Sequence, residues 1–506
     1  MAGQLQLDGN TLTRRAFEEV VFESRRVALH PRARKAMARS RALVERLIAA
    51  RQVVYGVTTG FGALSTERIQ PEQARALQLN LVRSHSSGVG EPLGVPESRG
   101  ILLLRANALA KGLSGVRSQV VDCLCDFLNH GVHPVIPSRG SVGASGDLAP
   151  LAHVALALIG EGDVVFRRRT ISATRALQTI RRKPLMLEAK EGLALVNGTQ
   201  AMLSLGLLAL RQAEMLVDTA DVAGALSVDA LRGSPAAFDE RLHRARPHAG
   251  QLHTARNLLR LNRGSTIRQS HFDCPRVQDA YSLRCMPQVH GAARDAFAFA
   301  GRVLEIEMNS ATDNPLVFAS AGEVISGGNF HGQPLATALD LMAIALTQLG
   351  GISERRIDRM VNPLTSDLPA FLTKAHGLES GCMMAQVTAA ALASENKILA
   401  HPASVDSVPT SGNKEDYVSM GMTAALKLRP ILANVAMILA IEFLVASQAL
   451  DLLAPLRTGR LAEKARQMVR RVSAQITADR RLDRDIARLA ERVSTGDFSR
   501  ILEPSR

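Results

Sequence analysis

Residues 431–450 read ILANVAMILAIEFLVASQAL, an almost unbroken apolar stretch with the length of about five helical turns. Asn434, Glu442 and Gln448 interrupt it with polar side chains, which are rare inside a membrane-spanning helix. No second stretch of the sequence is comparably apolar. The pattern therefore predicts a long helix in the interior of a helical bundle and no membrane span.

Helical periodicity extends outward from this stretch over most of the chain. Long helices of the bundle are predicted at 288–310, 333–360, 380–401 and 414–454, and other helices at 37–52, 72–84, 97–130, 148–160 and 193–220. Strand patterns are confined to two short ribbons, at 164–172 and 315–326. We therefore expect a mainly α fold with a central bundle of long helices and few short strands. We expect an N-terminal, mostly helical domain at 1–200 and the long-helix bundle with a C-terminal helical region at 201–506.

The composition supports a large helical core. The 506 residues are 46% hydrophobic and 3% aromatic and contain no Trp, which excludes a disordered chain and argues against an all-β fold. The five cysteines are scattered and form no CxxC pair, so neither a disulfide framework nor a zinc site is predicted. The first residues lack the apolar segment of a secretory signal, and we therefore expect a cytoplasmic protein.

The net charge of +14 has two interpretations. One is binding to nucleic acid, and the other is an Arg-rich surface that attracts anionic substrates. From Arg457 onward Arg alternates with Asp and Glu at helical spacing, and no zinc finger or RNA-binding motif is present. We therefore expect no nucleic-acid partner. A non-enzymatic basic helical scaffold stays open as an alternative, which a salt-dependent DNA shift would support.

Glycine-rich polar segments separate the predicted helices. They are YGVTTGFG (55–62), SHSSGVGEPLG (84–94), GSVGASGDLAP (140–150), ISGGNFHGQP (325–334) and PTSGNKED (409–416). All three tyrosines of the chain, Tyr55, Tyr281 and Tyr417, lie in or beside polar segments of this kind. Because functional residues concentrate in ordered loops, these segments are predicted to converge on one site.

The segment GSVGASGDLAPLAH (140–153) carries the most specific pattern. By itself Ala-Ser-Gly is a weak signal, and Asp147 reads as a helix N-cap. The whole string resembles the signature of the aromatic amino acid ammonia-lyase family, to which histidases and phenylalanine ammonia-lyases belong. The resemblance implies that Ala144, Ser145 and Gly146 cyclise autocatalytically to 4-methylideneimidazole-5-one (MIO). Glycine leaves its amide nitrogen unhindered for attack on the Ala144 carbonyl, and Ser145 then loses its hydroxyl as water.

The resemblance covers nearly the whole chain and implies catalytic roles for further residues. Tyr55 matches the family's base for the β-proton, and Asn197 matches a site amide that touches substrate or ring. From the residues alone, Asn197 is equally well a helix cap. Arg284, in VQDAYSLRCMPQVHG (277–291), would clamp the substrate carboxylate with its guanidinium fork. The other site residues implied in this way are Gln278, Tyr281 and Phe330. The resemblance implies no metal and no diffusible cofactor.

Three polar residues indicate the substrate. Ser84 and His85 resemble the histidase version of the selectivity position, where phenylalanine lyases typically carry Phe-Leu and tyrosine lyases His-His. Glu415 also resembles histidases, and such polar groups can hydrogen-bond an imidazole. The resemblance therefore implies elimination of ammonia from L-histidine to give trans-urocanate.

Some residues depart from the common family pattern. They are Met286, Lys414, Tyr417 and the string HGQP (331–334). Because of them, a tyrosine or phenylalanine ammonia-lyase, or a 2,3-aminomutase with the same electrophile, stays open as an alternative. A fumarase or aspartase type of lyase has a similar helical build, but its GSSxMPxKxNP loop is absent from the sequence.

The resemblance also implies the ammonia-lyase/fumarase-aspartase-like superfamily fold. It further implies a homotetramer whose active sites gather loops from several subunits. Polar segments that lie hundreds of residues apart in the chain could meet in such an assembly, and association would bury apolar helices that one core cannot cover.

Overall fold

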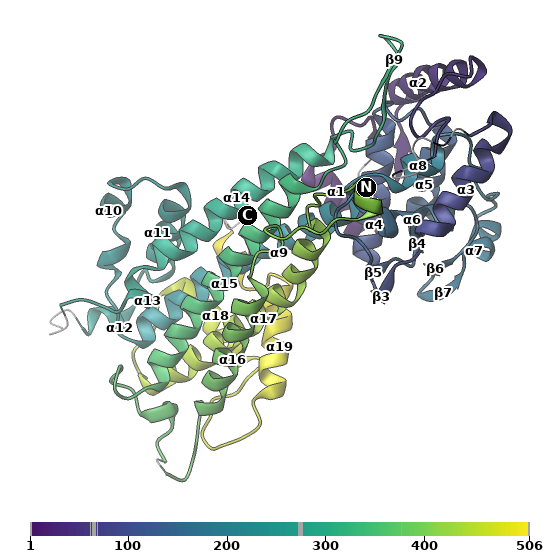
Figure 1. Ribbon diagram of the computed structural model, residues 1–506. Coiled ribbons are helices and arrows are strands. Elements are labelled where there is room, and N and C mark those ends of the chain that lie inside the picture. The colour runs from purple at the N-terminus through teal and green to yellow at the C-terminus, as the bar shows by residue number, and fades with distance from the viewer. Residues whose placement is uncertain are drawn as a thin grey trace. The chain divides into compact units, whose positions relative to one another are not determined.

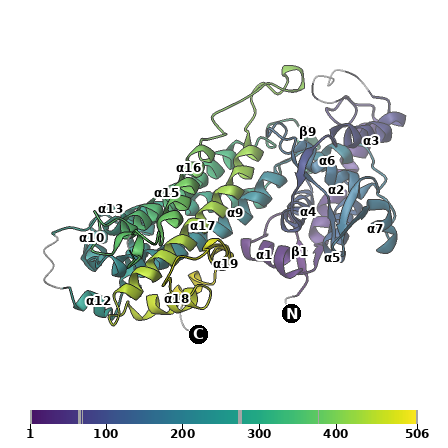
Figure 2. The same cartoon turned by 90° about the horizontal axis from the view of Figure 1, so that it is seen from below.

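The computed structural model describes residues 3–60, 62, 67, 69–271, 277–375 and 377–503. It is mainly helical with a few short strands, as predicted (Figures 1 and 2). The chain divides into two compact units. Unit 1 comprises Met1–Leu208, Gly301–Leu339 and Pro402–Leu426, and unit 2 comprises Ala209–Ala300, Asp340–His401 and Lys427–Arg506. The consecutive domains expected from the sequence differ from this division, because periodicity along the chain does not reveal which later segments return to pack with earlier ones.

Unit 1 holds every strand in the described part of the chain, together with short and medium helices. Its strands are β1 Leu5–Leu7, β2 Val27–Leu29, β3 Val89–Pro92, β4 Val132–Pro134, β5 Pro137–Arg139, β6 Asp163–Phe166, β7 Arg169–Ser172, β8 Leu316–Phe318 and β9 Glu323–Ile325. Its helices are α1 Arg14–Glu23, α2 Pro31–Ala49, α3 Ala74–His85, α4 Val95–Ala110, α5 Ser118–His130, α6 Leu148–Leu158, α7 Ala173–Thr179 and α8 Glu191–Val196, with short 3₁₀ turns at Pro71–Gln73 and Ser411–Asn413.

The strands form small separate sheets. β1 pairs with β2 in parallel, β3 with β5 antiparallel, β4–β6–β7 form an antiparallel sheet, and β8 pairs with β9 antiparallel. The β6–β7 and β8–β9 hairpins confirm the two ribbons that the sequence predicts. The predicted single helix at 97–130 is wrong, because the structure has α4 and α5 there. Gly112, between them, has φ +77°, and a Cβ on it would lie 2.8 Å from Ala36 Cβ, so the chain turns where only glycine fits.

Four long helices have residues in both units: α9 Gln200–Ala230, α14 Met286–Met308, α15 Gln333–Val361 and α17 Gly421–Leu452. Unit 2 adds α10 Glu240–Arg244, α11 Ala249–Leu261, α12 Thr266–Gln269, α13 Tyr281–Arg284, α16 Met383–Leu399, α18 Arg460–Arg470 and α19 Asp483–Ser494, with 3₁₀ turns at Pro235–Phe238, Ala370–Leu372 and Ser499–Leu502.

Within unit 2 the long helices pack side by side (Figures 1 and 2). A Cβ on Gly350 of α15 would lie 3.3 Å from both Ile438 and Val435 of α17, so a small residue permits close approach. By length and composition, α15 and α17 could each cross a membrane. However, 61% and 83% of the most apolar 18-residue stretch of each helix, respectively, are buried inside the structure. Burial of α17 agrees with its prediction as a bundle-core helix.

The polar residue at the centre of the apolar stretch, Glu442, has a buried partner. Arg356 of α15 donates to both Glu442 carboxylate oxygens, with Nη2 at 2.9 Å from Oε2. Ser227 of α9 donates to Oε1 at 2.6 Å, and neither charged side chain is exposed to solvent. The ion pair thus links three helices of the core of unit 2.

We expect Glu442→Ala to lower the free energy of unfolding by about 3–5 kcal/mol, because it leaves the Arg356 guanidinium buried and unpaired. Urea unfolding followed by the helical circular dichroism signal measures the change. Arg241→Ala serves as the control, since it removes an ion pair whose Arg side chain is 90% exposed and should cost less than about 1 kcal/mol. Equal effects of the two substitutions would contradict a structural role of the buried pair.

Candidate active site

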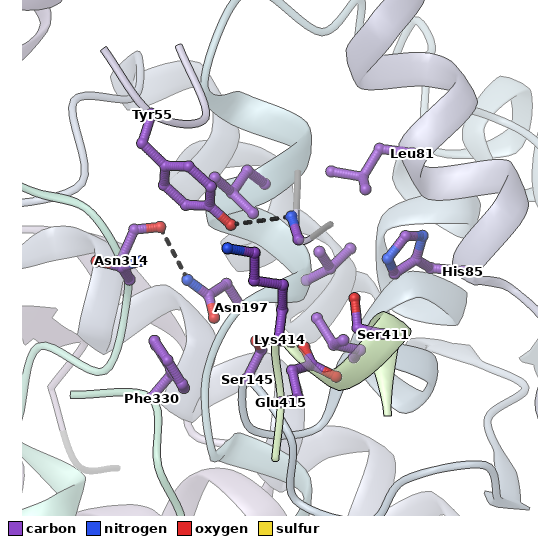
Figure 3. A pocket seen from close by; sticks show the side chains of 14 residues that line it. Tyr55, Leu81, His85, Ser145, Asn197, Asn314, Phe330, Ser411, Lys414 and Glu415 are labelled. Carbon is purple, nitrogen blue, oxygen red and sulfur yellow. Dashed lines mark hydrogen bonds between the residues drawn. The ribbon is translucent and has the colours of Figure 1, made fainter. Parts of the chain in front are cut away.

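A cavity of about 420 Å³ in unit 1 brings together side chains from distant parts of the chain (Figure 3). It contains six of the residues that the sequence predicts: Tyr55, His85, Ser145, Asn197, Phe330 and Glu415. The other residues that line it are Gly62, Leu81, Leu148, Leu193, Val196, Asn314, Ser411 and Lys414. All five glycine-rich segments, at 55–62, 84–94, 140–150, 325–334 and 409–416, therefore converge, as predicted.

The Ala144-Ser145-Gly146 tripeptide forms a tight turn. A bridge between Gly143 and Gly146 closes this turn, and Ser145 has φ +49°, in the left-handed region. Gly146 is bridged to Gly198 as well, and a Cβ on Gly146 would lie only 2.1 Å from the Gly198 carbonyl oxygen. Glycine is thus required at 146 by space as well as by conformation.

The next residue, Asp147, occupies the N-cap position of α6, as predicted, but its side chain does not cap the helix. Its side chain makes no cap hydrogen bond to α6. Instead, Oδ2 accepts the backbone N–H groups of Ala201 and Met202 at 2.9 Å, and Ser141 Oγ donates to Oδ1 at 3.2 Å. Burial raises the pKa of Asp147 to about 7, against the opposing effect of these hydrogen bonds. Asp147 thereby ties the tripeptide turn to the first turn of α9.

Glu415 lies against the serine of the tripeptide. Ser145 Oγ donates to Glu415 Oε1 at 3.0 Å, and Thr410 Oγ1 donates to Oε2 at 2.6 Å. Backbone hydrogen bonds between Thr410 and Glu415 run in both directions and close the loop that carries the carboxylate. The carboxylate is therefore held in place next to the hydroxyl group that MIO formation would remove.

His85 lies at the C-terminal end of α3, with its ring at the cavity (Figure 3). Ser84 Oγ donates to the Leu81 carbonyl at 3.1 Å and lies 3.1 Å from His85 Nδ1. Because a serine hydroxyl has one proton, we assign the proton of the imidazole to Nδ1 and leave Nε2 as an acceptor. Burial lowers the pKa of His85, which keeps the ring neutral at neutral pH.

Asn197 directly follows α8, but its side chain does not act as the helix cap that remained open from the sequence. Its Nδ2 donates to Asp313 Oδ1 and to the Asn314 carbonyl, each at 3.0 Å. Opposite this group, the Tyr55 hydroxyl accepts the Gly62 N–H at 3.3 Å. Figure 3 shows Tyr55, Asn197 and Phe330 around the same hollow as Ser145.

Comparison with known proteins identifies the family of the chain. The sequence profile of the family described as aromatic amino acid lyase matches residues 12–471. The chain belongs to the aromatic amino acid lyase family. It is 58% identical to histidine ammonia-lyase from Koribacter versatilis (strain Ellin345), over 98% of each chain. The crystal structure of histidine ammonia-lyase from Trypanosoma cruzi is 43% identical, with a TM-score of 0.90, over 98% of this chain and 94% of that one. Tyrosine aminomutase from Streptomyces globisporus is 41% identical, with a TM-score of 0.93, over 99% and 98%.

Family membership confirms the fold and the ammonia-lyase class that the sequence predicts, and it overturns the non-enzymatic alternative. Members of the family use the MIO group. The residues of this chain fit that group, because the tripeptide is held in a closed turn, position 146 admits only glycine, and the Ser145 hydroxyl is bonded to a carboxylate. Within the described ranges, no group of three or more His, Cys, Asp or Glu side chains could hold a metal ion.

The remaining predicted site residues do not line the cavity. Gln278, Tyr281 and Arg284 all belong to unit 2. The Arg284 guanidinium carbon lies 4.6 Å from the centre of the Tyr281 ring, which is 71% exposed. Arg284 Nε is buried without a hydrogen-bond partner in the described structure. Arg284, which the resemblance implies as the carboxylate clamp, and the tripeptide therefore belong to different units.

The residues that depart from the common family pattern lie in different parts of the structure. Met286 is fully buried in unit 2 and does not line the cavity. Its sulfur lies so close to Gly224 that a Cβ on that glycine would be 2.4 Å away. Tyr417 is 61% exposed and stacks on His331 with ring centres 6.3 Å apart. Lys414 alone among these three departures lines the cavity. Met286 and Tyr417 are not among the residues that line the cavity in the described part of the chain.

Sequence reasoning missed two residues behind the cavity. Lys190 Nζ donates to Asp313 Oδ2 at 2.6 Å, and both side chains are buried. Asp313 is the lone charged residue before an apolar run in SATDNPLVF, whereas Lys190 stands between Glu188 and Glu191 at the start of the apolar run in LEAKEGLALV. A charge at the edge of a buried run is a usable signal for a buried pair, but nothing in the sequence says which charges meet.

Proposed function

We propose that this enzyme eliminates ammonia from L-histidine to give trans-urocanate, with a MIO group formed from Ala144, Ser145 and Gly146. The observation that carries the proposal is the cavity in which the tripeptide, a hydrogen-bonded Glu415 and a neutral His85 lie together. Similarity over nearly the full chain to histidine ammonia-lyases supports it.

The cavity residues suit an imidazole ring. His85 Nε2 is an acceptor and can take the ring N–H of a neutral imidazole. Glu415 supplies a second acceptor, or pairs with the imidazole when it is protonated. Phenyl rings offer no such donor, and binding one would leave both polar groups without a partner. Ser84, by holding His85 Nδ1, is part of this selectivity set.

The chemical step needs a base, an anchor and a leaving group. When formed, MIO supplies an electrophile that makes the substrate amine a leaving group. Tyr55 lies at the cavity and is the group that we propose to remove the β-proton. Phe330 covers the same cavity and helps to exclude water. Arg284 binds the α-carboxylate bidentately, and Gln278 and Tyr281 accompany it.

We further propose that the enzyme is a homotetramer with shared active sites, in the cytoplasm. Arg284 is not among the residues that line the cavity in the described part of the chain. In unit 2, α16 exposes apolar side chains along its length, with Met384 at 61% and Ile398 at 74% exposure, which a second subunit would cover. The cysteines in the described part of the chain are free thiols, as in a reducing compartment, and Cys274 lies outside the described residues.

Two activities of the same family are the alternatives: ammonia elimination from tyrosine or phenylalanine, and a 2,3-aminomutase reaction. The similarity to tyrosine aminomutase supports the second. The test is an elimination assay with L-histidine, L-tyrosine and L-phenylalanine side by side, with separate detection of β-amino acids. Urocanate as the main product supports the proposal, whereas coumarate, cinnamate or a β-amino acid as the main product contradicts it.

We expect Glu415→Gln to reduce histidine turnover about 10-fold or more relative to turnover of phenylalanine, because hydrogen bonds to a charged group contribute more than neutral ones. The ratio of kcat/KM for the two substrates measures the effect. Asp416→Asn is the matched control, since this neighbouring carboxylate is exposed and does not line the cavity. An equal loss on both substrates in Glu415→Gln would remove Glu415 from the selectivity set.

A further inference from the structure

The carboxamide of Asn197 has a fixed orientation. Both N–H bonds of Nδ2 are used, one on the Asp313 carboxylate and one on the Asn314 carbonyl, each at 3.0 Å. These two partners offer only acceptors to the amide. Turning the amide round would place its oxygen against two other oxygens, so the assignment of oxygen and nitrogen follows from the chemistry of the neighbours.

The oxygen of this carboxamide is unpartnered. Asn197 is 2% exposed, and its Oδ1 is buried without a hydrogen-bond donor in the described part of the chain. In Figure 3 the oxygen points away from Asn314 and toward the side of the cavity on which Ser145 lies. A buried acceptor without a donor is unfavourable and rare, so a donor from a bound ligand is the natural partner.

A buried ion pair holds this arrangement. Asp313 Oδ2 accepts from Lys190 Nζ at 2.6 Å, and Asp313 Oδ1 accepts the Asn314 N–H at 2.7 Å in addition to the Asn197 amide. The side chains of Lys190 and Asp313 are 0% and 2% exposed. The carboxylate is thus held by a cation on one oxygen and by two N–H groups on the other, and it cannot rotate without losing them.

We propose that the Lys190–Asp313 pair positions Asn197 so that its Oδ1 accepts a hydrogen bond from the amino group of the substrate. The inference rests on the proposed function and names the part of the substrate that Asn197 binds. An amino acid offers a carboxylate, which only accepts, and an amine, which donates. Because Asn197 presents an oxygen to the cavity, it repels the carboxylate and binds the amine. The carboxylate is then left to Arg284, and Lys190 and Asp313 are positioning residues.

The test compares two ligands that differ only in the amine. L-Histidine and 3-(imidazol-4-yl)propanoate are titrated calorimetrically into the full-length Ser145→Ala protein, which cannot consume them. We expect Asn197→Ala in this background to weaken histidine binding about 10- to 100-fold and propanoate binding less than about 2-fold. Equal weakening of both ligands, or a larger effect on the propanoate, overturns the proposal.

The positioning role is tested by Lys190→Met combined with Asp313→Asn. Removal of both charges avoids an unpaired buried ion, and the new carboxamide at position 313 can then donate to Asn197 Oδ1 and release the amide from its fixed orientation. We expect histidine binding to weaken about 10-fold and propanoate binding to stay within about 2-fold. Unchanged histidine affinity in a double variant of native helix content overturns the positioning role.

The matched control removes an ion pair of unit 1 that lies outside the cavity. Arg75 and Glu188 form an exposed pair, with Nη2 2.6 Å from Oε1. Arg75→Met with Glu188→Gln should leave both affinities unchanged. These binding results are independent of turnover, so absence of urocanate from the unmodified enzyme would contradict the proposed function alone.

Discussion

Ser145→Ala is expected to abolish ammonia elimination while the protein stays folded. Without the Ser145 hydroxyl no water can be lost to form the methylidene, and no other side chain of the cavity is an electrophile. The substitution removes one hydrogen bond, to Glu415, and keeps a Cβ at a position where φ is already +49°. We therefore expect a change in the free energy of unfolding of less than about 1.5 kcal/mol.

Two measurements check this prediction. Product formation is followed by absorbance, and the mass of the peptide around 140–153 is compared with the mass that the sequence requires. In the unmodified chain this peptide should be lighter than its sequence requires by two waters, one released by ring closure and one lost from Ser145. In Ser145→Ala the loss of water from the serine cannot occur. Ser320→Ala, at an exposed serine of the β8–β9 turn, is the control for general effects. Turnover by a well-folded Ser145→Ala protein would exclude the electrophile.

The second large effect concerns Arg284. Loss of its bidentate hydrogen bonds to the substrate carboxylate should lower kcat/KM at least about 100-fold in Arg284→Met. If the site is shared between subunits, co-expression of Arg284→Met with Ser145→Ala restores activity, because some sites then receive an intact Arg284 from one chain and an intact Ser145 from another. Random mixing restores about a quarter of the sites.

The control for this experiment is each variant expressed alone, which should stay inactive. A mixture of separately folded proteins, combined without exchange of subunits, is the second control. Activity in the co-expressed sample alone supports a site built from two chains. Complete inactivity of co-expressed subunits that have assembled together would show that one chain supplies both residues, and would contradict the shared site.

Selectivity at the imidazole end depends on protonation states that the surroundings set. We assign the proton of His85 to Nδ1, next to Ser84 Oγ, and burial lowers the pKa of His85 so that the ring stays neutral. Asp147, in contrast, has its pKa raised to about 7 by burial, although three hydrogen bonds favour its charged form. Both pKa shifts follow from packing around the residue, and neither could be derived from the residue type.

Much of the fold was predictable because its signals are local. The apolar stretch at 431–450 marks a core helix, and the short alternating patterns at 164–172 and 315–326 mark hairpins. The break between α4 and α5, near Gly112, could not be predicted in this way. Glycine also occurs within helices, so its presence in the sequence does not by itself mark the end of a helix. Asp147 resembles a helix cap in the sequence because its true partners, Ala201 and Met202, lie about fifty residues further along the chain.

The sequence by itself determined the family, the tripeptide that can cyclise, and the residues that indicate an imidazole substrate. Each of these depends on a short segment whose chemistry follows from residue type and spacing. Only the tertiary structure decided that Lys190 meets Asp313, which atom of Asn197 faces the cavity, and which later segments join unit 1. The physical reason is that hydrogen bonds between residues more than a hundred positions apart depend on how the chain folds back, and no local pattern encodes the direction in which an amide points.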